Sequence, residues 1–442
     1  MAGKGRDKGA GKSSGTNAEL SNGTVSRRKF LKSAASCAVA GYTAVNAPYI
    51  IAKKKVILRV MGTHVTLQEE LRQQAMKDLG FEIIFEAKGS AAVQQKASMF
   101  PEAFDLYEQW SNSIDVLWES GAIQAIDKTR ITHWGEVNSL TKTGKLKPDA
   151  KYGAGDAPYK LLNVQKNGSL SSHTSDEISF LPYVHNVDSF GYNTAVIPRG
   201  EPYKTESWGW LLNDDYRGRV GVVNAPTIGL FDMALAAQAR GLMQFNDIGD
   251  MSRQELDQLF SILAEFKQKG HFSGYWTSVP ESIEFMKSGR VVIESMFSPA
   301  VSSLNGQNVP VVYAAPKEGY RGWHGVMCLS SATQGQQKDA AYDYMNWWLS
   351  GWPGAFIARQ GYYISNPARS RELLTPQEWD YWYAGKEATT ELKGTDGKVS
   401  VKPGAVRSGG AYETRFSNVA VWNSVMRNYD YSLQKWYEFI SA

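Results

Sequence analysis

The stretch VILRVMGTHVTLQEELRQQAMKDLGFEIIFEA, residues 56–87, decides the fold class of this chain. Its two ends, residues 56–62 and 81–87, are short apolar runs, and such runs predict strands. Between them, an apolar side chain returns at every fourth position, at Leu67, Leu71, Ala75 and Leu79. This spacing covers one face of a helix, so the stretch predicts a strand, a helix and a second strand.

The predicted helix has its own start and stop signals. Thr66 and Glu69 stand three residues apart, the spacing of a capping box, in which each side chain accepts a hydrogen bond from a backbone N–H of the first turn. Gly80 follows the last apolar residue, and glycine readily takes the left-handed backbone that ends helices. We therefore expect a helix over residues 66–79.

The alternation continues downstream of this unit. Residues 91–99 predict a helix, FDLYEQW at 104–110 a strand, and residues 114–120 another helix. A βαβαβα order implies a parallel sheet with helices covering both of its faces.

The second half of the chain repeats this class of structure after a loop-rich stretch over residues 127–180. Extended segments are expected at 178–193, as two pieces, and at 218–226, 290–295 and 309–316. Helices are expected at 232–240, 252–269, 280–287, 338–349 and 352–359. Two α/β lobes joined by extended crossovers explain this order, and we expect lobe 1 at 53–185 plus 299–330 and lobe 2 at 186–298 plus 331–442.

In open parallel sheets, ligands lie beyond the carboxyl ends of the strands. The residues that follow the predicted strands are therefore the first candidates for a binding site. They are Gly62, Thr63 and His64, then 109–113, 224–229 and 295–299, and finally Trp323 and His324.

The charge of the chain is unevenly distributed. The net charge is +4, but the first 55 residues hold 11 Lys and Arg against 2 Asp and Glu, which leaves 37 basic and 42 acidic residues in the remainder. The main body is therefore mildly acidic, at −5, and it has no clustered basic segment of the kind that binds nucleic acid. We expect no nucleic-acid partner.

The N-terminal residues predict an export signal. Residues 1–25 are rich in Gly, Ser and Lys and are expected to be disordered. SRRKFLK, at 26–32, resembles the twin-arginine export signal and precedes a weakly apolar run too polar for a membrane span. We expect a signal peptide within residues 1–52, cleaved near Ala47 or Ala52, and transit through the twin-arginine translocase. An amphipathic surface helix is the alternative, and Cys37 as a lipid-attachment site is the weaker idea.

No motif for catalysis or for metal or cofactor binding is recognisable. The six His include no HExxH, and Cys37 and Cys328 cannot form a metal pair by spacing. GKSSG at Gly11 matches the nucleophile elbow in letters but has no strand before it and no helix after it. We expect no cofactor and no metal.

With the strand ends identified, the chain resembles the solute-binding proteins of bacterial ABC importers, in the branch of the spermidine and putrescine binders. The resemblance covers most of residues 56–370. It depends on the order and spacing of FDLYEQWSNSIDVLWESGAIQAID, PYVHNVDSFGYNTAVIP, MKSGRVVIESMFSPAV with PKEGYRGWHG, and IARQGYYISNPA. It implies the type II periplasmic-binding-protein fold, in which a monomer of two lobes closes by a hinge over a small organic solute and delivers it to a permease in the inner membrane.

The resemblance also implies which residues contact the solute. From the first lobe it implies Thr63 and His64 at one strand end and Trp110, Ser111, Asn112 and Ser113 at another. Phe297, Trp323 and Tyr362 match ligand-facing aromatic positions, and Trp276 and His324 are further candidates. Aromatic faces attract ammonium groups by about 0.5–2 kcal/mol each. Core or hinge packing is the alternative role for each aromatic residue, and an N-cap role for the serines and the asparagine.

The acidic half of a polyamine site is missing. The positions where polyamine binders have carboxylates carry Gly325, Ala225, Pro226 and Gly229. Glu108, Asp188 and Glu294 are possible substitutes, although Glu108 and Glu294 lie within predicted strands. We therefore predict a periplasmic binding protein for a polyamine or another amine. An exported enzyme or a chemosensory subunit on the same fold are the alternatives.

Overall fold

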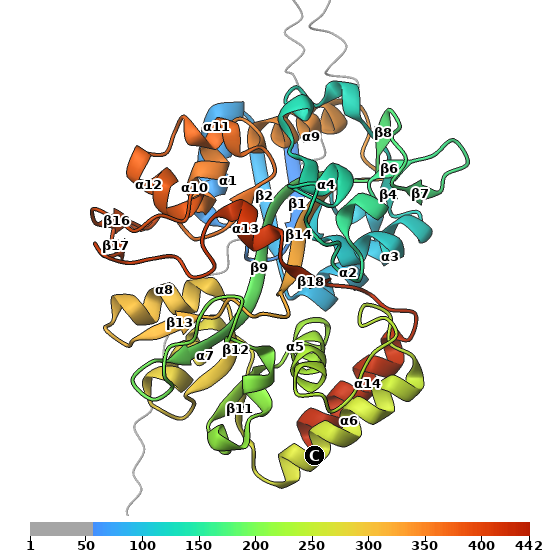
Figure 1. Cartoon of the computed structure of the whole chain (residues 1–442). Coiled ribbons are helices and arrows are strands. Elements are labelled where there is room, and N and C mark those ends of the chain that lie inside the picture. Colours follow the sequence, from blue (N-terminus) through green and yellow to red (C-terminus); the bar gives the residue numbers. More distant parts are fainter. Residues whose placement is uncertain (1–55) are drawn as a thin grey trace, which may run out of the picture. The chain divides into compact units, whose positions relative to one another are not determined.

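The computed structural model describes residues 56–442 (Figure 1). The expected twin-arginine signal lies outside the described residues. Among the described helices, none has the length and apolar character needed to cross a membrane.

Within residues 56–442, twelve strands join in one mixed sheet. Eight of them form its continuous order: β11 (Phe272–Trp276), β10 (Val220–Val223), β12 (Ile293–Met296), β9 (Leu181–Asn193), β14 (Tyr320–Ser330), β3 (Leu106–Trp110), β1 (Ile57–Gly62) and β2 (Glu82–Ala87). Four short strands pair with β9 or β14: β13 (Val311–Tyr313), β15 (Tyr363–Ile364), β18 (Val419–Trp422) and β4 (Ile123–Gln124).

The predicted parallel pairings are present, but they are not the whole sheet. β1 lies parallel to β2 and β3, and β10 lies parallel to β11 and β12. β9 and β14 run antiparallel to each other and to their neighbours β12 and β3, which joins the two parallel groups. The expectation of two parallel-type sheets is therefore corrected to one mixed sheet.

β9 is the element that the sequence analysis expected as two pieces. It is one strand of 13 residues, buried along almost its whole length. Strands β12, β13, β14 and β15 pair with it, so its backbone is bonded to partners far away in the chain. Figure 1 shows β9 running between the two groups of strands.

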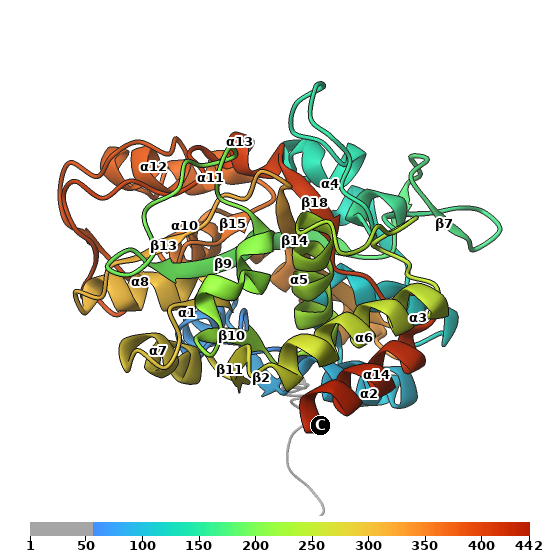
Figure 2. The ribbon, with the colours of Figure 1, turned by 60° about the horizontal axis from the view of Figure 1, so that its bottom comes forward.

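Fourteen α-helices lie in the described residues, around the sheet (Figures 1 and 2). They are α1 (Glu69–Leu79), α2 (Ser90–Met99), α3 (Ile114–Glu119), α4 (Ser139–Thr143), α5 (Pro226–Ala239), α6 (Arg253–Gln268), α7 (Val279–Lys287), α8 (Ser298–Gly306), α9 (Gly335–Trp348), α10 (Trp352–Ala358), α11 (Pro367–Arg371), α12 (Pro376–Trp382), α13 (Tyr412–Phe416) and α14 (Tyr429–Ser441). Two small sheets complete the described chain: β5 (Ile126–Asp127), β8 (Glu177–Ile178), β6 (Asn163–Val164) and β7 (Leu170–Ser171), and the pair β16 (Leu392–Lys393) and β17 (Val399–Val401).

The helix α1 ends as predicted but begins later. Gly80 caps its C-terminus with φ 75°, in the left-handed region. The first residue is Glu69, and Gln68 caps the helix without a side-chain hydrogen bond, so the predicted capping box is absent. The Thr66 hydroxyl instead accepts a hydrogen bond from Tyr183 at 3.0 Å, so a contact with β9 replaces the local cap.

Two large apolar cores lie against the sheet. The first surrounds β1, β2 and β3 and includes α1 and α9, and the second surrounds β10 and includes α5, α6 and α14. The segment 340–364 packs in the first core, through side chains such as Tyr344 and Trp348. There, α9 packs against α1 and β1.

Candidate functional site

Four aromatic and two charged residues meet in a small cavity at the junction of the two strand groups. It has a volume of about 40 Å³ and is lined by Val65, Trp110, Asp188, Ile228, Phe297, Arg321, Trp323, Tyr362 and Asn423, which we call the aromatic cleft. Trp110 ends β3, Phe297 follows β12, and Trp323 lies in β14. Of the predicted site residues, Trp110, Phe297, Trp323 and Tyr362 are brought together here.

The aromatic rings of the cleft lie edge to face. The ring centroids of Trp110 and Trp323 are 6.3 Å apart with an interplanar angle of 88°, and those of Trp323 and Tyr362 are 5.6 Å apart at 71°. This T-shaped packing orients the rings without stacking them flat on one another. The cleft therefore has several aromatic walls that differ in direction.

Phe297 is held from behind by Trp276. Their ring centroids are 5.0 Å apart, nearly perpendicular, and the Trp276 indole N–H donates to the Ser295 carbonyl at 3.0 Å. Trp276 is 1% exposed and does not line the cleft. It supports the cleft residue Phe297 from within the core.

Three buried charges form the polar side of the cleft. The Arg321 guanidinium donates from Nε to Asp232 at 2.7 Å and lies 3.4 Å from Asp188. Asn423 accepts from the same guanidinium at 3.2 Å, and the Tyr313 hydroxyl donates to Asp188 at 3.3 Å. Two carboxylates against one guanidinium leave this group one negative charge in excess when both carboxyls are ionised.

Burial makes these carboxyls harder to ionise. It raises the pKa of Asp232 to about 6 and raises the pKa of Asp188, in each case against the opposing attraction of Arg321. One Asp232 oxygen, Oδ2, has no hydrogen-bond partner among the described residues. A bound cation would favour the ionised form of both side chains.

Thr63 and His64 do not line the aromatic cleft. Thr63 is buried and its carbonyl accepts from the Leu67 amide at 3.1 Å, whereas His64 is exposed. Their neighbour Val65 takes the position at the cleft. The structure therefore places the predicted strand end beside the cleft but turns a different side chain toward it.

Ser111, Asn112 and Ser113 are buried below Trp110. They form a single 3-10 turn, and the Ser113 hydroxyl donates to the Trp110 carbonyl at 2.8 Å. None of the three lines the cleft. In the structure their visible role is to hold the backbone that carries Trp110.

His324 points away from the cleft. Successive side chains of a strand project to opposite faces, so Trp323 and His324 lie on different sides of β14. His324 stacks on His185 with centroids 4.7 Å apart, and its Nε2 lies 2.7 Å from the Thr141 hydroxyl. Burial lowers the pKa of His324 to about 4.

Of the three acidic residues considered for the missing carboxylates, Glu108, Asp188 and Glu294, only one faces the cleft. Glu108 accepts from Tyr183 at 3.1 Å within the first core, and Glu294 accepts from Ser282 at 2.9 Å below β10. Neither lines the cleft, whereas Asp188 does. Among the three, strand direction leaves only Asp188 facing the aromatic rings.

Two of the four positions that lack carboxylates, Gly325 and Gly229, have no room for a side chain. A Cβ added at Gly325 would lie 2.6 Å from the Val184 carbonyl oxygen, and one at Gly229 would lie 2.4 Å from the Val223 carbonyl oxygen. Backbone atoms cannot move aside as a flexible side chain does. These glycines are therefore required by close backbone packing.

Val65, Arg321 and Asn423 are cleft residues that the sequence analysis did not select, whereas Ile228 lies in the strand-end segment 224–229 that it did. A signal for Arg321 was present, because it lies two residues before Trp323 and residues two apart in a strand share a face. Asn423 carries no such signal, because it directly follows a strand, β18, that pairs with β14 only in the folded chain.

Comparison with protein families connects this geometry to a known class. The family of bacterial extracellular solute-binding proteins matches residues 70–368. The chain belongs to this family. It is an α/β solute-binding protein with the two-lobed periplasmic-binding-protein fold, as expected. A search of curated proteins found no significant match.

Solved structures share the fold over most of this solute-binding protein. The spermidine/putrescine ABC transporter substrate-binding protein PotD from Streptococcus pneumoniae is 14% identical, with a TM-score of 0.57, and the match covers 87% of this chain and 98% of that one. The TpPotD lipoprotein of Treponema pallidum is 12% identical, with a TM-score of 0.59 and coverage of 87% and 99%. The PBP AgtB from A. tumefaciens, solved with agropinic acid, is 13% identical, with a TM-score of 0.54 and the same coverage. At these identities the likeness establishes the fold.

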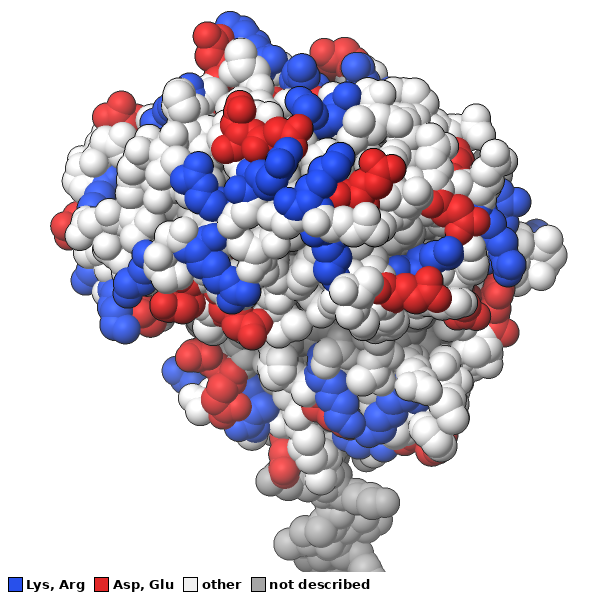
Figure 3. All heavy atoms as spheres, turned by 90° about the horizontal axis from the view of Figure 1, so that it is seen from below, with Lys and Arg blue, Asp and Glu red and all other residues white. Residues whose placement is uncertain are grey.

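Charged side chains of both signs occupy the surface of this solute-binding protein. On the face in Figure 3, basic and acidic side chains are interspersed. Surface ion pairs of the described chain include Arg369 with Glu136 at 2.7 Å and Arg130 with Asp339 at 2.9 Å. This face therefore presents small mixed patches of charge.

Proposed function

We propose that this solute-binding protein captures a small organic amine in the aromatic cleft and serves an ABC importer as its binding component. The observation that carries the proposal is the pairing of aromatic rings with the buried carboxylate of Asp188, which shares the one guanidinium of Arg321 with Asp232. An ammonium group placed among the rings would neutralise that charge. Ring faces add about 0.5–2 kcal/mol for each favourable contact with a cation.

A single ammonium group fits this cleft better than a polyamine does. The excess is one negative charge, and a second buried ammonium without a partner costs several kcal/mol. The acidic position at Gly325 is closed by the Val184 carbonyl. Although the PotD structure above is that of a spermidine/putrescine transporter protein, we infer that this chain selects a monoamine or a zwitterion with one amine.

Capture requires the cleft to open. A volume of about 40 Å³ holds only a few water-sized groups, so a solute enters when its walls separate. β9 and β14 connect the two strand groups and pass beside the cleft, at Asp188 and at Arg321 and Trp323. We infer that bending of these strands opens and closes the site.

The cellular setting is part of the proposal. The protein works in the periplasm as a monomer, after export through the twin-arginine translocase, and it hands its solute to a permease in the inner membrane. The family and the SRRKFLK segment support this setting. The assigned role is binding without turnover.

Thermal unfolding of the full chain with added solutes tests the amine site. The panel contains monoamines (ethanolamine, choline, 4-aminobutyrate), polyamines (putrescine, spermidine) and amine-free controls of similar size. A ligand that binds only the folded state raises the melting temperature in proportion to RT ln(1+[L]/Kd). A rise with at least one monoamine, larger than that with spermidine, supports the proposal, and a panel in which no amine shifts the transition overturns it.

A further inference from the structure

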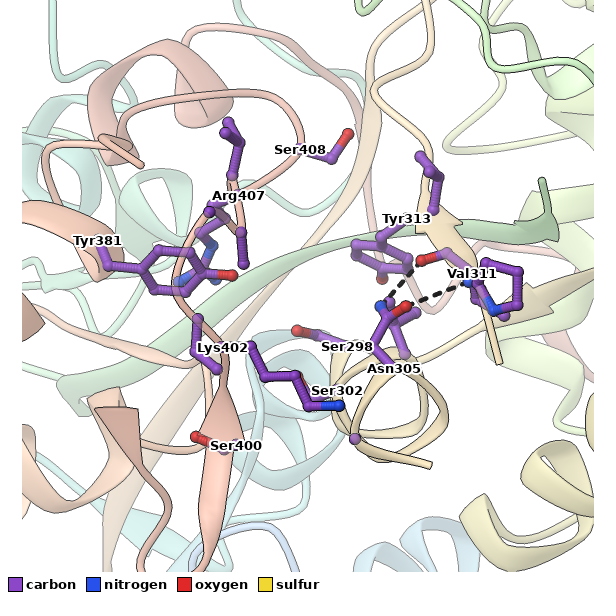
Figure 4. Close-up of a pocket in the computed structure, with 18 of the residues that line it drawn as sticks. Ser298, Ser302, Asn305, Val311, Tyr313, Tyr381, Ser400, Lys402, Arg407 and Ser408 are labelled. Carbon is purple, nitrogen blue, oxygen red and sulfur yellow. Dashed lines mark hydrogen bonds between the residues drawn. The ribbon is translucent and has the colours of Figure 1, made fainter. Parts of the chain in front are cut away.

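A second and larger cavity lies beside the aromatic cleft and shares no residue with it. It has a volume of about 600 Å³ and lies between α8 with β13 on one side and the C-terminal segment 381–408 on the other. We call it the C-terminal cavity. Figure 4 shows Tyr381, Arg407 and Lys402 on one side and Ser298, Ser302 and Tyr313 on the other.

The lining of the C-terminal cavity is basic. Four basic side chains, Arg199, Lys402, Arg407 and Arg415, line it, and no Asp or Glu is among its lining residues. Hydroxyl groups, including those of Ser298, Ser302 and Tyr381, add hydrogen-bond donors. A concave surface of one charge sign concentrates ligands of the opposite sign.

Arg407 is a buried cation without a carboxylate partner in residues 56–442. It is 7% exposed and donates to the carbonyl oxygens of Gly361 at 2.7 Å and Trp382 at 3.3 Å. Its guanidinium lies 4.9 Å from the Trp382 ring and 4.8 Å from the Tyr363 ring. These dipoles and ring faces hold the cation in place but leave its charge uncompensated.

Arg415 has even fewer partners. It is 1% exposed, and the single hydrogen bond of its guanidinium within the described residues goes from Nη1 to the Ser408 carbonyl at 2.7 Å. Its Nε and Nη2 are buried and have no hydrogen-bond partner in residues 56–442. Such donors cost free energy when they are left unpaired, by about 1–3 kcal/mol each and more for charged groups.

The neighbouring acids do not balance these cations. Asp188 interacts electrostatically with Arg415, but it already shares Arg321 with Asp232. The buried side chains around the two cavities therefore include three guanidiniums and two carboxylates. The excess positive charge lies on the side of the C-terminal cavity.

We propose that the C-terminal cavity binds the oxyanion group of a small molecule: a phosphate, sulfate or carboxylate. Charge-assisted hydrogen bonds from guanidinium groups to such oxyanions are the strong class of hydrogen bond, and the planar guanidinium matches their geometry. Arg407 and Arg415 lie beyond residue 368, where the family match ends, so the two buried cations of this site come from the C-terminal segment outside the match. The inference does not depend on the amine site.

A pair of aspartate variants on α8 tests the proposal with little risk to the fold. Ser302 lines the C-terminal cavity and Ser303, its neighbour on the same helix, does not. Ser302→Asp brings a carboxylate to the cavity, where it competes with an anion for the arginines. Ser303→Asp adds the same charge to the same helix and is the matched control. Arg415→Gln is the direct variant, but it removes a buried side chain and so carries a risk of unfolding.

Calorimetric titration of the full chain with sodium phosphate, sodium sulfate and sodium succinate, at constant ionic strength set by chloride, gives the result. We expect saturable binding of at least one anion to the wild type and to Ser303→Asp, and at least a tenfold weaker affinity in Ser302→Asp. Phosphate or sulfate alone would indicate an inorganic ligand, and succinate alone an organic acid. Absence of saturable binding to the wild type, or equal binding to Ser302→Asp and wild type, overturns the proposal. The melting temperatures of the variants without anion show that they are folded.

Discussion

Arg321 lies opposite Asp188 in the register of β14 and β9, and its Nη2 is 3.4 Å from the Asp188 carboxylate. The same guanidinium binds Asp232 of α5 more closely, at 2.7 Å. Asp188 is therefore the more distant of the two carboxylates from Arg321, and it is the one that lines the aromatic cleft. We therefore expect a bound ammonium group to pair with the Asp188 carboxylate, which serves as its anchor.

Asp188→Asn removes that anchor while keeping the shape of the side chain. We expect the affinity for the amine found in the thermal screen to fall at least tenfold, which corresponds to about 1.4 kcal/mol. Arg321 keeps Asp232 as its partner, so the fold is expected to persist. Calorimetric titration of the amine measures the change.

Glu108→Gln is the control for Asp188→Asn. It also neutralises a buried carboxyl group on a central strand, but Glu108 lies in the first core and not at the cleft. Its amine affinity should stay within about twofold of the wild type. If both variants lost affinity equally, the assignment of Asp188 as the anchor would be wrong.

Trp323→Leu tests the aromatic wall of the cleft. Trp323 contacts both Trp110 and Tyr362 edge to face, so its removal takes away one ring face and disturbs the orientation of two others. A loss of about 0.5–2 kcal/mol of cation–π attraction predicts an affinity about 2 to 30 times weaker. Trp118→Leu is the matched control, since Trp118 packs at the edge of the same core and donates to the Gly168 carbonyl, away from the cleft.

Local patterns in the sequence predict single helices and strands better than they predict which distant segments those elements contact. The strand, helix and strand at 56–87 were predicted because their signals lie within one helical turn or one strand, and β1, α1 and β2 follow them closely. The capping box failed because Thr66 bonds to Tyr183, which is 117 residues away. β9 was divided in two because its length depends on pairing with four other strands.

The same distinction applies to the site. Trp110, Phe297, Trp323 and Tyr362 were selected through the resemblance, and the structure brings them together. His324 was selected for its position next to Trp323, although strand alternation alone places the two on opposite faces. The arginines of the C-terminal cavity, Arg199, Arg407 and Arg415, were not selected, because they come from separate segments of the chain and meet around one cavity with α8 only in the folded chain.

The buried carboxyl group of Glu108 should make the stability of the folded protein depend on pH. Burial raises its pKa to about 7 in the folded protein, against an ordinary value of 4.5. The folded state thus holds a proton that the unfolded state releases between pH 4.5 and 7, and stability falls as the pH rises through this window. The loss is about 3 kcal/mol once the pH exceeds 7.

Glu108→Gln isolates this effect, because glutamine does not ionise and can still accept a hydrogen bond from Tyr183. Urea unfolding at pH 5 and pH 8 measures the free energy of unfolding of both proteins. We expect the wild type to lose stability relative to the variant at pH 8. Other buried acids with a raised pKa, such as Asp156, remain in both proteins and cancel. A constant difference between the two proteins at both pH values would contradict a buried, proton-holding Glu108.

The stacked pair His185 and His324 predicts a dependence of the opposite sign. Burial lowers the pKa of both rings, that of His324 from 6.5 to about 4, and their hydrogen-bond partners suit neutral imidazoles. Below pH 6.5, the His324 imidazole therefore binds a proton in the unfolded state, whereas in the folded state it binds one only near pH 4. Stability contributed by His324 is complete above pH 6.5 and is lost as the pH falls toward 4, by about 3 kcal/mol.

His324→Asn, measured by urea unfolding at pH 7 and pH 4.5, should lose less stability on acidification than the wild type. His173→Asn, at an exposed site, is the matched control and should follow the wild type, and an equal loss in all three proteins would rule out the buried pair as the source of acid sensitivity.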